Sequence, residues 1–335
     1  MNDRLFWPRS AARRQFMGRM VSGSALLCGA SPWPVALAQE NAPVRLVVPF
    51  TPGTGIDTVA RALAPRLAER FGRPFVVDNV AGASGNIGTQ QVARAKPDGN
   101  TLLVTVNTFV MNRSLFKTVP YDPVKDFEPI AQTSLGTLVL VAHPGASART
   151  LPDLITQAKG NPRGLNYASP GVGTPHHLAM SLLEWRAGID LVHVPYKGTA
   201  GALTDLLGGH VPYMFLPVHV ALPHLRSNKL VAMASGSERR LPALPQLPTF
   251  AEQGIAEMVV DMWYGVLAPR GTPLDVVGRY EREIERILAL PEIRDAFETQ
   301  GMVPAPAGAQ AFGRTVQADL QRWAEVIRRA GVTAD

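Results

Sequence analysis

The stretch R-L-V-V-P-F-T-P-G-T-G-I-D at 45–57 decides the fold of this chain. Its first six residues are mostly apolar, as expected of a buried parallel strand. Residues 51–55 contain two glycines and a proline, which is typical of a loop. Apolar residues then recur at helical spacing between Ile56 and Phe71. The stretch therefore predicts a strand, a glycine-rich loop and an amphipathic helix in succession.

The same alternation continues along the chain. A first series is predicted to contain strands at 74–80 and 101–106, a loop at 81–86 and a helix at 87–95. A second series is predicted to contain strands at 138–142, 165–169, 191–195, 211–216 and 230–234, with helices at 151–159, 176–185 and 201–207. Amphipathic helices are expected at 274–288 and 309–329. Such alternation predicts an α/β fold, with helices on both faces of a parallel or mixed sheet.

Two strands are placed to connect two lobes. They are Leu138–Ala142, at the start of the second series, and Trp263–Ala268, after a proline-rich stretch. We therefore expect lobe 1 to comprise 39–140 plus 262–335 and lobe 2 to comprise 141–261.

The N-terminus predicts export. Arg13 and Arg14 precede an apolar stretch rich in small residues, and Ala36-Leu37-Ala38 places alanines at the −3 and −1 positions of a signal-peptidase site. Residues 1–38 are therefore predicted to be a signal peptide cleaved after Ala38, which implies a periplasmic protein. The paired arginines also fit a twin-arginine signal, so that route and the general secretory route both remain open.

Removal of the signal changes what charge and cysteine content imply. The mature chain would carry 28 basic and 26 acidic residues, so its net charge of +2 gives no indication of nucleic-acid binding. The only cysteine, Cys28, lies within the signal. A lipoprotein cleavage before it would put Leu27, instead of a small residue, at −1. The mature chain therefore has no disulfide, no thiolate nucleophile and no thiolate metal site.

Three glycine-rich loops are the candidate binding elements. The loops at 51–55, 81–86 and 169–174 each precede a predicted helix, where unpaired N–H groups and the helix dipole favour an anion. Loops at the carboxyl ends of parallel strands can converge on one crevice. None of the three fits a nucleotide-binding motif. Asp57 could receive a polar group of the ligand, but we favour a role in holding its loop through N–H groups.

The motifs of common enzymes are missing. The chain contains no G-x-S-x-G and no H-E-x-x-H. His176 and His177 are adjacent, so they point in different directions from a helix and are poorly placed to share a metal ion. Ser169 and His177 could suggest acyl transfer, but no third group to orient them can be identified. The sequence thus predicts a protein without enzymatic activity, metal or cofactor.

Several runs of sequence resemble the Bug (Bordetella uptake gene) receptors, the substrate-binding subunits of tripartite tricarboxylate transporters. They are V-R-L-V-V-P-F-T-P-G-T-G-I-D (44–57), V-V-D-N-V-A-G-A-S-G-N-I-G (76–88), P-D-G-N-T-L-L (97–103), Y-A-S-P-G-V-G-T-P-H-H-L (167–178), H-V-P-Y-K-G (193–198), L-P-T-F-A-E-Q-G (247–254) and W-Y-G-V-L-A-P-R-G-T-P (263–273). The resemblance implies a type II periplasmic-binding fold, in which two α/β lobes are joined by two crossing strands and hold the ligand between them.

The resemblance also implies which residues bind the ligand, largely through main-chain N–H groups and ordered waters. The first two loops would contribute Thr51, Gly53, Thr54, Gly55, Asp57, Ala83, Ser84, Gly85 and Asn86. The other lobe would contribute Ser169, Gly171, Gly173, Thr174, His177, Lys197, Gly198 and Thr199. Thr54 stands where the family commonly has a glycine, and Asn100 where it has a tyrosine. The first departure adds a side chain at the mouth of the pocket.

The function implied is the capture of a small carboxylate and its delivery to the membrane subunits of a tripartite tricarboxylate transporter. We expect a monomer that does not bind nucleic acid. A receptor of the same fold that signals ligand occupancy to a sensor kinase is one alternative. A secreted hydrolase is another, and it would require turnover of ester or phosphate substrates.

Overall fold

The computed structural model describes residues 42–196, 198–299 and 301–334. The predicted signal peptide, its cleavage site and Cys28 therefore lie outside the described residues, as does Lys197. None of the described helices is both long and apolar enough to cross a membrane.

The first half of the fold, called half A below, is built on a mixed sheet. Its strands are β1 (Val44–Val48), β2 (Phe75–Asn79), β3 (Thr101–Val106), β9 (Asp261–Pro269), β10 (Met302–Gly308) and the first part of β4 (Phe127–Ala142), in the order β2-β1-β3-β9-β4, with β10 on the other side of β4. β1 is parallel to β2 and β3, whereas β9 is antiparallel to β3 and β4. Its helices are α1 (Gly55–Phe71), α2 (Asn86–Ala93), α3 (Thr108–Leu115), α8 (Leu274–Ala289), α9 (Pro291–Thr299), α10 (Ala309–Ala330) and the short 3₁₀ helix η1 (Ala83–Gly85).

The second half, called half B, has its own group of strands. They are β5 (Asn166–Ser169), β6 (Val192–Pro195), β7 (Tyr213–Pro217), β8 (Val231–Ser235) and the last part of β4, in the order β4-β7-β5-β6, with β8 also on β4. The helices are α4 (Leu151–Gly160), α5 (Pro175–Ala187), α6 (Thr199–Leu207), α7 (Val218–Arg226) and the 3₁₀ helix η2 (Ala251–Gln253). The mixed α/β fold predicted from the sequence is confirmed.

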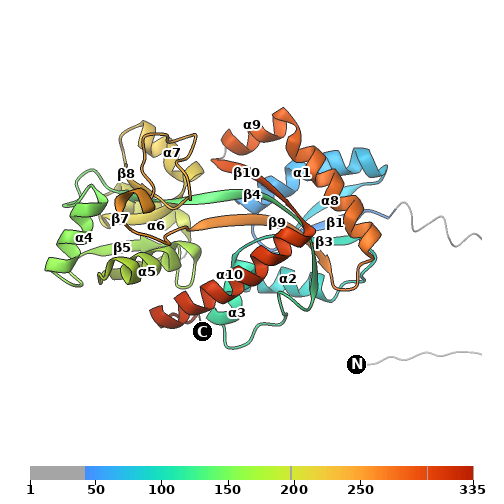
Figure 1. The fold of residues 1–335 in the computed structure, drawn as a ribbon, viewed down its shortest axis with the longest axis horizontal. Coiled ribbons are helices and arrows are strands. Elements are labelled where there is room, and N and C mark those ends of the chain that lie inside the picture. Colours follow the sequence, from blue (N-terminus) through green and yellow to red (C-terminus); the bar gives the residue numbers. More distant parts are fainter. Residues whose placement is uncertain (1–41, 197, 300, 335) are drawn as a thin grey trace, which may run out of the picture. The chain divides into compact units, whose positions relative to one another are not determined.

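One strand, β4, belongs to both halves (Figure 1). Its residues 127–137 pair with β9, and its residues 138–142 pair with β7 and β8. The chain returns to half A just before β9, where the Val260 N–H donates to the carbonyl of Gly236 and Asp261 pairs with Thr137. The segment Leu138–Ala142 is thus part of a crossing strand, as predicted. Trp263–Ala268 lies within the sheet of half A, and the return crossing immediately precedes it.

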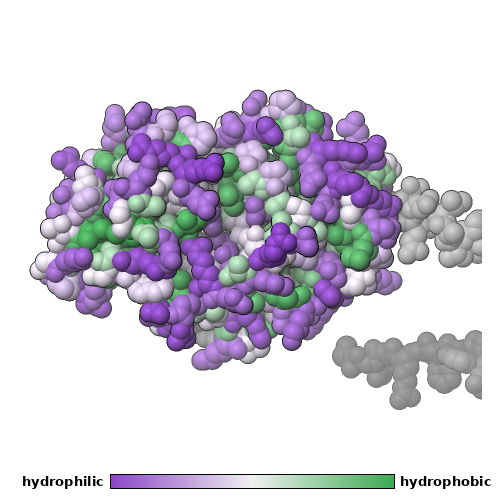
Figure 2. Space-filling model, in the orientation of Figure 1, coloured by the Kyte–Doolittle hydropathy of each residue, from purple (hydrophilic) through white to green (hydrophobic). Residues whose placement is uncertain are grey.

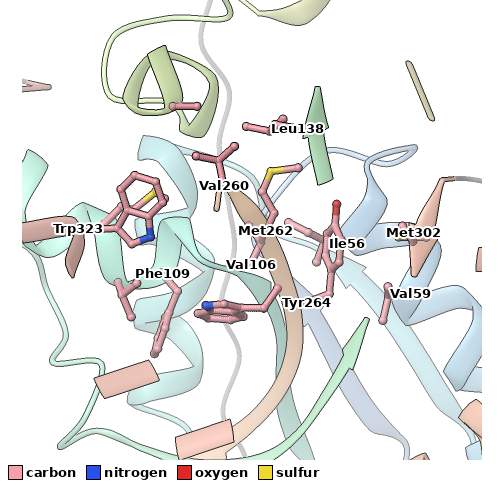
Figure 3. Close-up of a cluster of buried hydrophobic side chains, with 14 of the residues drawn as sticks. Ile56, Val59, Val106, Phe109, Leu138, Val260, Met262, Tyr264, Met302 and Trp323 are labelled. Carbon is pink, nitrogen blue, oxygen red and sulfur yellow. The ribbon is translucent and has the colours of Figure 1, made fainter. Parts of the chain in front are cut away.

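The core is continuous from half A into half B. Buried side chains of α1, β3, β4, β9 and α10 form one cluster that includes Leu138 and Val260 at the crossing (Figure 3). α10 contacts both α3 and α5, so it packs on elements of both halves. Its apolar face carries Phe312, Val316 and Trp323, while hydrophilic side chains predominate on the outer surface shown in Figure 2. A smaller second cluster packs α6 and α7 against β4, β5 and β7.

Several elements were not predicted from the sequence. α3 is buried at Phe109, Val110 and Met111 in succession, so it shows no single apolar stripe. The first part of β4 buries polar residues such as Thr133 and Ser134, which hide its strand pattern. The remaining unpredicted elements, α7, α9 and β10, each contain prolines, which ordinarily mark the ends of helices and strands.

Candidate binding pocket

A cavity of about 580 Å³ opens between loops of half A and half B. This size lies within the range of pockets that enclose small organic ligands. Half A contributes Phe50, Thr51, Gly53, Thr54, Gly55, Ile56, Ser84, Val106, Thr108, Asn112, Met262 and Tyr264 to its wall. Half B contributes Pro170, Gly173, Thr174, Pro175, His176, Gly198, Thr199, Pro217, His219 and Val220.

Helix N-termini converge on this pocket. Residues from the first turn, or from the position just before it, line the wall for α1, α3, α5, α6 and α7. Of these five helices, α5 is capped by the Thr174 side chain. α1, α3, α6 and α7 have no hydrogen bond from a capping side chain among the described residues. The first N–H groups of a helix have no partner within the helix, and they form the positive end of its dipole. The pocket wall is therefore rich in main-chain donors suited to an anion.

The wall is otherwise uncharged. No Asp, Glu, Lys or Arg occurs among the described residues that line it. Phe50, Ile56, Val106, Met262 and Val220 give it an apolar component. In such surroundings a hydrogen bond to a charged group is stronger than it is in water. A wall of this kind has donors for an anionic group of a ligand and an apolar surface for the rest of it.

Asp57 holds the first loop in place. Its carboxylate accepts hydrogen bonds from the Gly53 N–H (2.9 Å), from Arg61 Nε (2.8 Å) and from Asn79 Nδ2 (3.0 Å). Burial alone would raise the pKa of Asp57, but the bonds from Arg61, Gly53 and Asn79 outweigh it and hold the pKa below its ordinary value. These contacts support the loop-holding role rather than direct contact with a ligand.

The second loop is strained and is held by an asparagine. Ser84 has φ of 53°, in the left-handed region that residues other than glycine rarely occupy. Asn112 on α3 donates to the Ser84 carbonyl (2.9 Å) and to Asn86 Oδ1 (2.8 Å). Because Ser84 and Asn112 both line the pocket, this strain is located at the site itself.

The third loop rests on a stack of aromatic rings. His177 Nδ1 accepts from the Gly173 N–H (3.0 Å), and its ring stacks on His193 at 3.8 Å between centroids. His193 Nε2 lies 2.6 Å from Ser169 Oγ. Burial, with the nearby His193, lowers the pKa of His177 to about 3, and burial lowers that of His193 to about 4. Both rings are therefore neutral at physiological pH. They hold the loop through the contacts of His177 with Gly173 and of His193 with Ser169.

Several glycine N–H groups in and near the loops are already paired within the protein. Gly85 donates to Gly82 O, Gly171 to Ser169 Oγ and Gly198 to Pro170 O, while Gly53 and Gly173 donate as described above. The hydroxyls of Ser169 and Thr174 both bond to the Gly171 carbonyl. These glycine N–H groups hold the loops in place, and the first helical turns supply further main-chain donors that have no partner within their helices.

The predicted site residues divide into two groups. Those that line the pocket are Thr51, Gly53, Thr54, Gly55, Ser84, Gly173, Thr174, Gly198 and Thr199. Those that do not line the wall lie in the loops that frame it or in the adjoining ends of helices and strands: Asp57, Ala83, Gly85, Asn86, Ser169, Gly171 and His177. Lys197 lies outside the described residues.

Sequence reasoning missed several residues of the wall. His176 and His219, from the first turns of α5 and α7, both line the pocket, as does Tyr264 from β9. Burial lowers the pKa of both histidines, that of His176 to about 4, so both rings are neutral at physiological pH. A tyrosine inside an otherwise apolar strand was the one available signal, because its hydroxyl needs a polar neighbour.

The described residues include no group of three or more His, Cys, Asp or Glu that could hold a metal ion. Among the described residues of the wall, no nucleophile has both a base and an orienting group beside it. The chemistry that this wall offers is binding.

Comparison with known proteins agrees with this geometry. Residues 59–332 match the model of the tripartite tricarboxylate transporter family receptors. Protein BugT of Bordetella pertussis is 36% identical over 291 residues, which cover 86% of this chain and 89% of BugT. The structure of R. palustris Rpa4515 with adipate superposes with a TM-score of 0.77 at 33% identity and covers 87% of this chain and 98% of that one. The periplasmic binding protein BugD superposes with a TM-score of 0.75 at 35% identity, with the same coverage.

These findings confirm the resemblance to the Bug receptors and the periplasmic-binding fold that it implied. They also confirm the prediction of a solute-binding receptor instead of an enzyme, because the family and its structural neighbours are binding proteins. The chain belongs to the tripartite tricarboxylate transporter family receptors.

Proposed function

We propose that this chain is a periplasmic receptor that captures a small carboxylate in the cavity between half A and half B. It would then deliver the ligand to the membrane subunits of a tripartite tricarboxylate transporter. The convergence of helix N-termini on a wall without charged side chains, among the described residues, carries the proposal. The adipate of Rpa4515 supports this ligand class.

In this proposal the halves act as the two lobes predicted from the sequence. The ligand would touch α1 and α3 on half A and α5, α6 and α7 on half B. A ligand that contacts both halves stabilises the closed arrangement by the free energy of its second set of contacts. A ligand that contacts only one half binds the open and closed arrangements equally, so it does not shift the equilibrium between them. The proposed mechanism is therefore closure around a bound carboxylate, by a monomer exported after cleavage behind Ala38.

Thr199 offers a direct test of the main-chain donors. It is the first residue of α6, where proline is well tolerated, so Thr199→Pro removes one N–H group while keeping the helix. Thr199→Val is the matched control, because it removes the hydroxyl and retains the N–H group. A hydrogen bond to a charged group contributes about 1.5–3 kcal/mol.

We expect the wild type to bind adipate in titration calorimetry, Thr199→Pro to bind about 10-fold more weakly or worse, and Thr199→Val to be less affected. If the valine variant loses as much affinity as the proline variant, the hydroxyl and not the main chain holds the ligand. If the wild type binds neither adipate nor any other carboxylate, the proposed function is wrong.

A further inference from the structure

The hydroxyl of Tyr264 belongs to a side chain of the pocket wall and has no hydrogen-bond partner among the described residues. Its side chain lines the pocket, yet the residue is only 3% exposed. No described residue makes a hydrogen bond to this hydroxyl, whereas Tyr121 donates to Phe109 O (3.0 Å) and Tyr280 to Gly99 O (2.8 Å). The hydroxyl is not among the fully buried side-chain atoms that lack a partner, so it is free to pair with a group inside the pocket.

Two glycines make room for this ring at the N-terminus of α1. A Cβ atom on Gly55, the first residue of α1, would lie 2.6 Å from the Tyr264 hydroxyl, and one on Gly136 of β4 would lie 2.9 Å from it. Successive side chains of a strand point to opposite faces of the sheet. Trp263 donates to Asp319 on α10, so the next residue, Tyr264, points to the face away from α10. Figure 3 shows Tyr264 close to Ile56 and Met262, which also line the pocket.

The hydroxyl has the right chemistry to act as a donor there. Burial raises the pKa of Tyr264, so the phenol keeps its proton at physiological pH. It lies beside the positive end of the α1 dipole, where an anion is favoured. A carboxylate at this helix end would accept from both the first-turn N–H groups and the phenol.

We propose that the Tyr264 hydroxyl donates a hydrogen bond to the carboxylate of the ligand, because none of the described residues uses this donor. This inference rests on the proposed function and adds to it a side-chain donor on the strand adjacent to the crossing.

The test is Tyr264→Phe, which preserves the ring and removes only the hydroxyl. We expect adipate and hexanoate each to bind at least about 10-fold more weakly in titration calorimetry, because a hydrogen bond to a charged group is lost. The melting temperature of the ligand-free variant should stay about the same, because no hydrogen bond among the described residues is lost.

Tyr213→Phe is the matched control. The Tyr213 hydroxyl accepts from the Ala148 N–H (3.1 Å) and does not line the pocket, so its loss should lower the melting temperature and leave affinity unchanged. Unchanged affinity in Tyr264→Phe would overturn the inference while leaving the proposed function intact. A lower melting temperature together with weaker binding would also overturn it, because the hydroxyl would then have a structural role. A wild type that binds no carboxylate would contradict the proposed function itself.

Discussion

Replacement of His176 by phenylalanine should make the protein less sensitive to acid. The two ring nitrogens of His176 are buried and have no hydrogen-bond partner among the described residues. Burial, with a smaller contribution from His219, lowers its pKa from 6.5 to about 4. The folded state therefore keeps this ring neutral at pH 5, while the unfolded state protonates it. Because the unfolded state binds more protons, the free energy of unfolding falls as the pH drops from 6.5 towards 4.

The magnitude follows from the two pKa values. Between pH 7.5 and pH 5.0, a group with a pKa of 4 in the folded state and 6.5 in the unfolded state removes about 2 kcal/mol from the free energy of unfolding. Phenylalanine has a similar ring shape and no proton to bind, so this loss should be absent from His176→Phe. Other groups that titrate in this range, such as Glu184, contribute equally to both proteins and cancel in the comparison.

Urea denaturation at the two pH values measures the effect. The decrease in unfolding free energy from pH 7.5 to pH 5.0 should be smaller in His176→Phe than in the wild type by about 2 kcal/mol. His210 is exposed, so His210→Phe is the matched control and should leave the decrease unchanged. Equal pH dependence of the wild type and His176→Phe would refute the reasoning, because it would mean that the ring is equally accessible to protons in both states.

Two further predictions concern closure and export. Small-angle scattering should give a smaller radius of gyration with saturating adipate than without ligand, because the proposed binding mode has the ligand contact helix ends on both halves; an unchanged radius would rule out closure. N-terminal sequencing of the protein purified from its native periplasm should begin at Gln39, since Ala36 and Ala38 provide the small residues of the cleavage site. A lipid-modified start at Cys28 would contradict that prediction.

The alternating part of the fold could be predicted because its patterns are local. β1 and β3 are short, mostly apolar runs, α1 has apolar residues at helical spacing, and glycines mark the loops around them. The crossing could be predicted only in part. The first part of β4 buries Gln132, Thr133 and Ser134 next to partners distant in sequence, such as the Tyr264 carbonyl, which accepts from Thr133 Oγ1 at 3.1 Å. A polar residue at a buried position of a strand needs such a hydrogen-bond partner. A single sequence does not show where that partner lies, so the strand could not be recognised.

The binding site, like the crossing, could be predicted only in part. Glycine-rich loops before helices indicated where an anion would bind, and residues such as Gly55 and Thr199 do line the pocket. The sequence could not show that the Gly85 N–H is used within its own loop, nor that the Gly198 N–H pairs with Pro170 of the third loop. It also could not place Tyr264 beside α1, because that neighbour depends on β9 following β3 in the sheet. Local pattern thus predicts which loops matter, whereas tertiary contacts determine which atoms of those loops are free.

The pairing of Thr137 with Asp261 has a consequence for protein engineering. These residues face each other across antiparallel strands at the point where the chain leaves half A and where it comes back. Antiparallel neighbours can be joined by a two-residue turn. Residues 138–260 therefore have the topology of an insertion into a β-hairpin. Replacing them with Asn-Gly would turn β4 and β9 into a direct hairpin and leave a shortened chain of half A. Grafting a different α/β segment at the same two residues would give a chimaera in which one wall of the pocket is exchanged and the other is kept.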